Sequence, residues 1–152
     1  MIVIGIDPGK SGGIAWRNEL YMRSEKMPAT ERDVVDVLRP LSLQTPVHCF
    51  IEAVGAMPGQ GVTSMFSFGQ GYGFLRGCLH CLDIRFEKVT PQKWQREFGL
   101  LRTDKAETNT AKKNRHKAKA QQLFPGTNVT HAIADALLIA EYGVRVTAAR
   151  SR

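Results

Sequence analysis

The sequence predicts an α/β domain with a mixed five-stranded sheet flanked by helices, and three observations lead to this class. Residues 2–6 form a β-branched apolar run, which is typical of a strand buried on both faces. Residues 14–16 and 20–27 follow as two strands of an antiparallel meander. A helix-patterned segment, 31–40, then leads to a second buried strand at 47–51. Because a helical crossover between strands is right-handed, this strand should lie parallel to the first.

The rest of the chain adds one strand and four helices to this plan. The long helix is expected at 62–82 and the fifth strand at 83–89, and Thr90-Pro91 should open a short helix. The segment 100–110 is expected to be a mobile loop. Helices are then expected at 112–124 and after Thr130, a good helix cap. Pro40 should close the first helix.

Length and composition favour one soluble domain, residues 1–152. The chain has 152 residues and 43% hydrophobic content, which suffice for one real core. No apolar run approaches the length of a membrane span, and the N-terminus enters the first strand without a leader pattern, so we expect a cytosolic protein with no membrane partner. The odd number of cysteines, three, argues against a disulfide framework.

Three acids interrupt apolar elements. Asp7 ends the first strand before Pro8-Gly9, and Glu52 ends the parallel strand, so both should emerge at the sheet edge where α/β proteins bind ligands. Asp135 lies inside the last apolar helix, where a carboxylate without a partner is costly. His131 precedes it by four residues and so lies on the same helix face. For Asp7, an aspartate that merely starts a turn is the alternative.

Clustered carboxylates next to a basic segment predict a nuclease. Carboxylates repel one another unless a cation neutralises them, and all-oxygen ligation suits Mg²⁺ or Mn²⁺ rather than zinc. Two such ions about 4 Å apart can activate a water and stabilise the departing oxygen of a phosphodiester. Residues 102–119 carry seven Lys and Arg against two acids, a net +5 of the chain's +7. This bias suggests a polyanion partner, with a solvated helix face as the alternative.

The helix expected at 62–82 has two apolar stripes, and its four glycines need an explanation. Each glycine costs about 1 kcal/mol of helix stability relative to alanine. One stripe includes Leu75 and Leu79 and should cover the sheet, while the other includes Phe66 and Phe74. Close backbone packing against a neighbour is the expected compensation. We expect a homodimer through this second stripe; an entirely intramolecular core is the alternative.

Four motifs in order carry a resemblance to a known family. They are Ile4-Gly5-Ile6-Asp7-Pro8-Gly9, Ile51-Glu52, Ser64-x-x-x-x-Gly69-Gln70-x-x-Gly73 and Ala134-Asp135-Ala136-Leu137-Leu138-Ile139-Ala140. Together they resemble the RuvC family of Holliday-junction resolvases, most closely its smaller phage-type members. The resemblance implies a ribonuclease-H-like fold, a homodimer, and Mg²⁺-dependent paired nicking of four-way DNA junctions in a phage or bacterial host cytosol. It also implies that Asp7, Glu52 and Asp135 are the metal-binding acids.

Two departures from the family pattern concern the site. The family usually has an acid or histidine three residues before the last aspartate, where this chain has Ala132; His131 is the candidate substitute as ligand or proton carrier, with a structural histidine as the alternative. The aromatic residue that members often offer to the junction is replaced by Ala56-Met57-Pro58. Family lysines contact the scissile phosphate, and the expected DNA contacts here are Lys93, Lys112, Lys113, Arg115, Lys117 and Lys119.

Other functions compete with the resolvase. An RNA-processing nuclease of the pre-16S rRNA type shares the Asp-Pro-Gly strand and a C-terminal aspartate. A non-catalytic junction-DNA-binding module would explain the basic segment but would not need all three acids. Actin-like or sugar-kinase phosphotransferases also begin with Ile-Asp-x-Gly, but 152 residues are too few for their two lobes.

Overall fold

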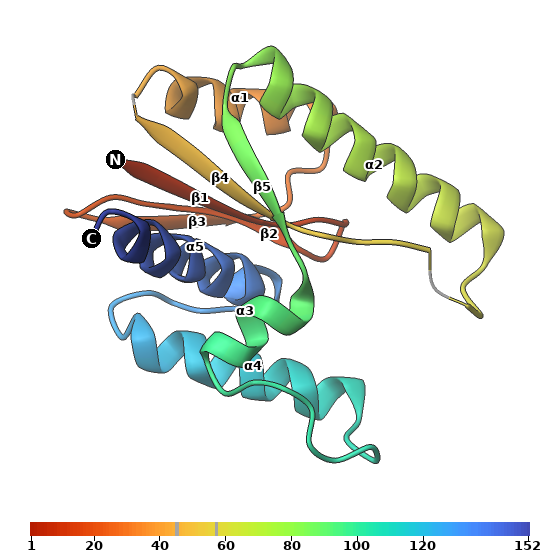
Figure 1. Cartoon of the computed structure of the whole chain (residues 1–152). Coiled ribbons are helices and arrows are strands. Elements are labelled where there is room, and N and C mark those ends of the chain that lie inside the picture. The colour runs from red at the N-terminus through yellow and green to blue at the C-terminus, as the bar shows by residue number, and fades with distance from the viewer. Residues whose placement is uncertain (45, 57) are drawn as a thin grey trace.

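A five-stranded mixed sheet lies between two groups of helices in the computed structural model, which describes residues 1–44, 46–56 and 58–152 (Figure 1). The strands are β1 (Ile2–Asp7), β2 (Gly13–Arg17), β3 (Met22–Lys26), β4 (Val47–Glu52) and β5 (Arg85–Val89). Their order in the sheet is β3-β2-β1-β4-β5. The α/β class with a mixed five-stranded sheet flanked by helices is therefore confirmed.

Strand pairing brings the first two acids to one edge. β1 pairs antiparallel with β2 and parallel with β4, as the crossover argument predicts. Ile6 is paired with Ile51 in the β1–β4 register, so Asp7 and Glu52 both follow directly at the carboxyl ends of neighbouring strands. These two strands are the centre of the sheet, and their interior residues are buried.

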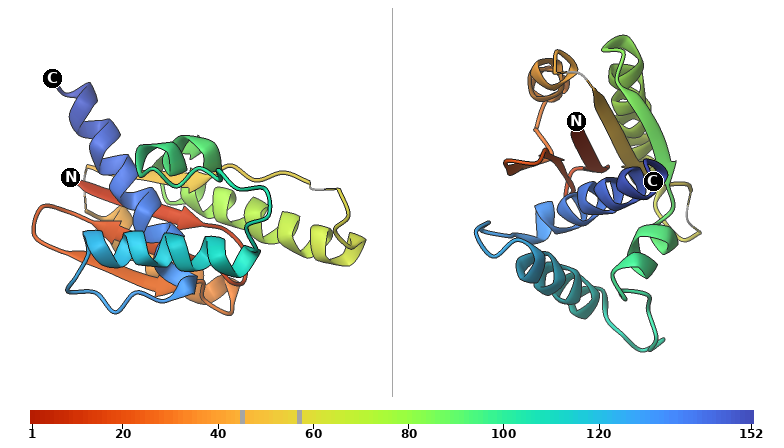
Figure 2. Two further views of the ribbon diagram at one scale, coloured as in Figure 1. Left: turned by 90° about the horizontal axis from the view of Figure 1, so that it is seen from below. Right: turned by 60° about the vertical axis from the view of Figure 1, so that its left-hand side comes forward.

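The helices cover the two faces of the sheet unequally. They are α1 (Glu31–Ser42), α2 (Val62–Cys81), α3 (Pro91–Glu97), α4 (Asn109–Leu123) and α5 (His131–Arg150). α1 and α2 lie on one face, while α5 lies on the other with α4 packed outside it (Figure 2). Each face has its own core, with Leu38 and Leu79 in one and Phe50 and Leu137 in the other. None of the helices in the described ranges combines the length and apolarity that a bilayer span requires.

α5 packs directly on β1 because glycine lets the two backbones touch. A Cβ on Gly5 would lie 2.3 Å from the amide nitrogen of Ala140 and 2.4 Å from the carbonyl oxygen of Ala136. A Cβ on Gly13, which pairs with Asp7, would lie 2.8 Å from the carbonyl oxygen of Ala132. The N-terminal part of α5 is thereby held over the carboxyl end of β1, and Asp135 is carried to the acid edge.

Two predicted helix boundaries are wrong. α1 continues past Pro40 to Ser42. A proline near the end of a helix removes only one hydrogen bond, and the buried side chain of Leu41 holds the last turn against the core. α4 begins at Asn109, three residues before the predicted start, because the hydroxyl of Thr108 accepts a hydrogen bond from the amide of Ala111 and caps the helix.

The two stripes of α2 are only partly as predicted: Phe74 of the second stripe is half-buried and packs against the core beneath α2, and the helix glycines do not pack closely within the chain. Leu75 and Leu79 are buried against the sheet, whereas Phe66 is 68% exposed. Apart from its chain neighbours and the helix's own backbone, a Cβ on any of the four helix glycines would meet no described atom within 4 Å; they are Gly69, Gly71, Gly73 and Gly77. The expected close packing is thus absent from the single chain.

Candidate active site

The three predicted acids converge at the carboxyl edge of β1 and β4. Burial raises the pKa of Asp7 well above its ordinary value, and the negative charges of Asp135 and then Glu52 raise it further. Burial also raises the pKa of Glu52; the Trp94 hydrogen bond opposes this and the charge of Asp135 adds to it. Carboxylates influence one another this way only across short distances. Residues far apart in the sequence therefore form one acidic cluster.

The cluster has the right ligand atoms for a divalent cation, although its three carboxylates are not yet arranged in metal-ligand geometry. In residues 1–44, 46–56 and 58–152, no three His, Cys, Asp or Glu side chains form a ready-made metal-ligand group. Carboxylate oxygens are the ligands that Mg²⁺ and Mn²⁺ prefer. A bound cation would offset both the burial and the mutual repulsion that raise the pKa of Asp7 and Glu52. Asp7, Glu52 and Asp135 therefore fit such an ion.

Two buried residues that sequence reasoning missed contact these acids. The indole Nε1 of Trp94 donates a hydrogen bond to Oε2 of Glu52 over 2.8 Å. Nδ1 of His116 lies 2.8 Å from Oδ1 of Asp135. A signal for His116 was available: with Ala120 and Leu123 it follows the helical spacing of an inward face within the basic segment, and His116 and Ala120 are buried. For Trp94, the helix placement was predicted, but nothing in the sequence indicated its partner.

His131 faces a different partner from the one predicted. Its Nε2 lies 2.8 Å from Oδ1 of Asn114 on α4, and the side chain is exposed. The histidine in contact with Asp135 is His116 instead. His131 lies one helical turn before Asp135 and therefore on the same side of α5. The imidazole ring in contact with Asp135, however, belongs to His116 on the adjoining helix α4. A role for His131 as ligand or proton carrier stays a prediction.

Two of the candidate lysines lie close enough to the acids to lower their pKa. The positive charges of Lys113 and Lys112 on α4 oppose the rise in the pKa of Asp7, and Lys112 does the same for Glu52. α4 therefore places its first basic turn beside the acidic edge. Lys117 and Lys119 follow on the same helix and are partly buried, and Lys93 is exposed on α3. Contact of any of these side chains with DNA stays a prediction.

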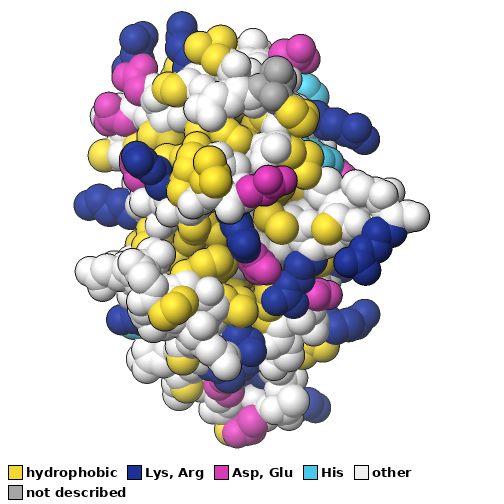
Figure 3. Space-filling model, turned by 90° about the vertical axis from the view of Figure 1, so that its left-hand side faces the viewer, with side chains coloured by type: hydrophobic (Ala, Val, Ile, Leu, Met, Phe, Trp, Pro, Cys, Tyr) yellow, Lys and Arg dark blue, Asp and Glu magenta, His cyan; other side chains and the backbone are white. Residues whose placement is uncertain are grey.

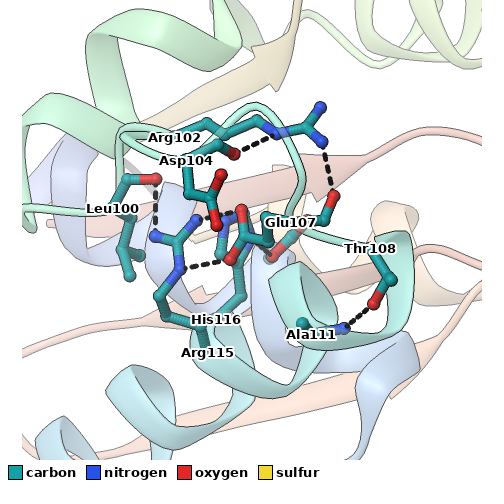
Figure 4. Close-up of polar contacts among 9 residues, drawn as sticks. Leu100, Arg102, Asp104, Glu107, Thr108, Ala111, Arg115 and His116 are labelled. Atoms are coloured by element: carbon teal, nitrogen blue, oxygen red, sulfur yellow. Dashed lines mark hydrogen bonds and ion pairs between the residues drawn. The ribbon is translucent and has the colours of Figure 1, made fainter.

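Arg115 closes the loop that precedes α4. Its guanidinium donates from Nε and Nη2 to the two carboxylate oxygens of Glu107, each over 2.9 Å, and from Nη1 to the Leu100 carbonyl over 2.8 Å (Figure 4). The guanidinium of Arg102 donates to the carbonyls of Asp104, Lys105 and Glu107. The loop predicted at 100–110 is irregular and tied by side chains. Arg115 uses three of its five donors in these contacts.

Aromatic side chains of α2 lie beside the same edge. Gly9, just after Asp7, has a φ of +107°, and a Cβ there would lie 2.9 Å from the ring of Phe68. The phenol of Tyr72 lies near the backbone of Val54, which follows Glu52 by two residues. The loop that departs from the family pattern includes Met57, which lies outside the described residues.

The opposite end of the molecule has a different surface. Figure 3 views the end where β1 begins, and there basic side chains are separated by acidic and hydrophobic ones. Basic side chains are thus dispersed at this end, in contrast to their succession along α4.

Comparison with known proteins adds evidence on the fold. No protein-family model matches the chain, and no curated protein sequence matches it significantly. A structure of Thermus thermophilus RuvC matches with a TM-score of 0.60 and 15% sequence identity over 97% of both chains. The chain has the RuvC fold. A second structure, T. thermophilus RuvC in complex with Holliday junction substrate, matches with a TM-score of 0.61 and 16% identity over 97% of this chain and 96% of that one.

The RuvC fold confirms the predicted ribonuclease-H-like architecture. Because the match runs over nearly the whole of both chains, it includes the central strands as well as α5. Identity of 15 to 16% supports the fold alone. The predicted likeness to phage-type members stays a prediction.

Proposed function

We propose that this chain, as one domain of residues 1–152, is a structure-selective endodeoxyribonuclease that cuts four-way DNA junctions in pairs of nicks, using Mg²⁺ or Mn²⁺. The observation that carries the proposal is the convergence of Asp7, Glu52 and Asp135 beside the basic face of α4. Further support comes from the fold, because a protein of this fold, T. thermophilus RuvC, has been solved with a Holliday junction substrate.

In the proposed mechanism Asp7, Glu52 and Asp135 would hold the divalent ions. When bound, such ions would supply an activated water and charge stabilisation for the departing oxygen of the phosphodiester. The chain's own residues then supply position and charge. Lys112 and Lys113 attract the DNA backbone to the acidic edge, which would otherwise repel phosphates, and they favour the ionised form of Asp7.

A cleavage assay tests the proposal. Purified protein with Mg²⁺ is expected to place symmetric nicks in a synthetic four-way junction and to leave linear duplex DNA and structured RNA intact. Preferential cutting of RNA would favour the pre-16S rRNA type of nuclease. Tight junction binding without cutting in either Mg²⁺ or Mn²⁺ would favour the non-catalytic module.

Reversing the charges of Lys112, Lys113 and Lys117 to glutamate should weaken junction binding and its dependence on salt. Each lost phosphate contact lowers the slope of log K against log salt by about 0.9. Binding isotherms at several salt concentrations measure this slope. As a control, Lys26, Arg32 and Arg39, which lie on β3 and α1, are reversed together. An equal change in the control would remove α4 from the proposed DNA contact.

We also propose that two chains pair through α2, which would supply the two sites that paired nicking needs. The outward stripe of α2 leaves Phe66 68% exposed and Val62 87% exposed, and its glycines leave room for the close approach of another backbone. Aspartate at position 66 would bury a charge in such an interface.

Light scattering at micromolar concentration should therefore give the mass of two chains for the wild type and of one chain for Phe66→Asp. Leu20→Asp is the matched control, because Leu20 is 91% exposed in the turn between β2 and β3. A wild type with the mass of one chain would contradict the dimer.

A further inference from the structure

A buried bridge of two rings connects two of the three acids. Trp94 on α3 hydrogen-bonds Glu52, and His116 on α4 hydrogen-bonds Asp135. The two rings meet edge to face, with centroids 5.3 Å apart and an angle of 77° between their planes. Trp94 is 0% exposed and His116 is 2% exposed. The bridge therefore runs through the core, behind the acidic edge.

We propose that Trp94 and His116 are positioning residues of the metal site, which set the orientation and separation of the Glu52 and Asp135 carboxylates. The inference rests on the proposed function, since it concerns the same three acids. Trp94 and His116 add hydrogen bonds that hold the Glu52 and Asp135 carboxylates in place, which neither the acids nor the basic helix provides without them.

Each contact fixes one oxygen of its acid. The indole N–H of Trp94 can only donate, so Oε2 of Glu52 is held in place as its acceptor. An ionised carboxylate only accepts, so the proton between His116 and Asp135 belongs to Nδ1 of the ring. Among the described residues, no other side-chain hydrogen bond to Glu52 or Asp135 occurs, and one oxygen of each acid stays free for a cation.

The bridge also sets the position of the basic helix relative to the acids. His116 follows Lys112 by four residues and therefore lies on the same face of α4. Asp135 lies on α5, against which α4 packs. A shift of α4 along α5 would break the hydrogen bond of His116 to Asp135. The same contact thus places Lys112 beside the site and orients Asp135.

The second ring nitrogen of His116 argues for a role beyond packing. Nε2 of His116 is buried and has no hydrogen-bond partner within the described residues. A buried polar atom left without a partner costs free energy. An apolar side chain of similar size would avoid that cost, so packing alone does not explain a histidine here. The hydrogen bond from Nδ1 to Asp135 does explain it.

Matched substitutions separate positioning from packing. Trp94→Phe removes the indole N–H and keeps an aromatic ring. His116→Leu keeps much of the volume and removes both nitrogens, whereas His116→Asn loses volume but keeps a donor at the place of Nδ1. A packing role ranks the leucine variant above the asparagine variant in every measurement. A positioning role reverses the ranking for metal binding only.

Calorimetric titration of the full chain with Mn²⁺ measures that ranking. Residues that hydrogen-bond the ligands of a metal are typically worth 10- to 100-fold in affinity, so Trp94→Phe and His116→Leu should raise the Kd about tenfold or more. His116→Asn should stay closer to the wild type than His116→Leu, although its thermal stability is lower. Trp16→Phe, which removes the other indole from β2, should leave the Kd unchanged. Junction cleavage should lose kcat with little change in KM.

The outcomes distinguish this inference from the proposed function. A wild type that binds no Mn²⁺ would overturn the metal site, and the inference with it. A wild type that binds Mn²⁺, with Trp94→Phe and His116→Leu binding equally well, would overturn the positioning role alone.

A second measurement needs no variant of the bridge to fold. In a ¹H–¹⁵N spectrum of the wild type, the indole signal of Trp94 should shift on addition of Mg²⁺, because its acceptor is a proposed ligand. The indole signal of Trp16 should stay in place, and Trp16→Phe assigns the two signals. An unmoved Trp94 signal at saturating Mg²⁺ would overturn the positioning role.

Discussion

Replacing Asp7 with asparagine is expected to reduce junction cleavage by about 1,000-fold or more while junction binding stays close to that of the wild type. A divalent ion supplies several kcal/mol of transition-state stabilisation, and each 1.4 kcal/mol is about tenfold in rate. The amide has nearly the same shape as the carboxylate but cannot neutralise the ions. Single-turnover cleavage and a binding isotherm on the same junction measure the two effects. Unchanged turnover would remove Asp7 from the site.

The same substitution is expected to stabilise the metal-free fold. Burial and the two neighbouring acids raise the pKa of Asp7 above its unfolded value, so the folded chain holds its proton more tightly. The contribution of Asp7 to the free energy of unfolding is therefore greatest below the pKa that Asp7 has in the unfolded chain. It is lost as the pH rises through the raised pKa of Asp7 in the folded chain. The asparagine side chain carries no charge and avoids this loss. Thermal unfolding without metal should thus give a higher Tm for the variant at pH 8, with a smaller difference at pH 4.

With Mg²⁺ bound, the wild type should become more stable than Asp7→Asn. At a Mg²⁺ concentration about 100 times its Kd, binding stabilises the wild type by about 2.7 kcal/mol. The variant should gain much less. Asp83→Asn is the control, because Asp83 is exposed and its φ of 52° suits asparagine equally well. A wild-type Tm that does not respond to Mg²⁺ would contradict a cation among the acids.

Gly5→Ala is expected to cause the largest loss of fold stability, about 3 kcal/mol or more. The added Cβ would lie within 2.4 Å of the backbone atoms of Ala136 and Ala140, which cannot rotate away as a side chain could. α5 would have to move off β1. Because Asp135 lies next to Ala136, the variant should also lose metal affinity and cleavage beyond what its unfolded fraction explains.

Chemical denaturation of Gly5→Ala measures the free energy of unfolding. Gly126→Ala is the matched control, since Gly126 lies outside α2, a Cβ there meets no atom of the described chain within 4 Å, and alanine restricts the unfolded chain more than glycine does. The control should therefore be at least as stable as the wild type. A Gly5→Ala protein of unchanged stability would contradict the direct contact of α5 with β1.

The acids were predictable because each marks an interruption of a simple pattern. Asp7 and Glu52 end buried strands, and the handedness of the crossover makes those strands parallel, so one topological rule brings them to one edge. Asp135 stands out in an apolar helix. The strands followed from apolar runs in β1 and β4, from the antiparallel meander in β2 and β3, and from alternation in β5. These inferences needed only periodicity and connectivity.

The supporting contacts were not predictable because they depend on how α3 and α4 pack against α5. The choice between His131 and His116 as the neighbour of Asp135 is set by the position of α4, which no sequence pattern gives. The hydrogen bond of Trp94 to Glu52 joins residues 42 positions apart. Likewise, no sequence pattern indicated that Arg115 pairs with Glu107 across the loop before α4. Its contact with DNA stays a prediction.

The distribution of the acids over β1, β4 and α5 also ties the proposed activity to the completion of folding. Asp135 belongs to the last helix of the chain, and its position depends on the seating of that helix over Gly5 and Gly13. A nascent polypeptide that has formed only its sheet possesses two carboxylates of the three. Such an intermediate would be inert towards the cell's DNA until its C-terminal segment has docked.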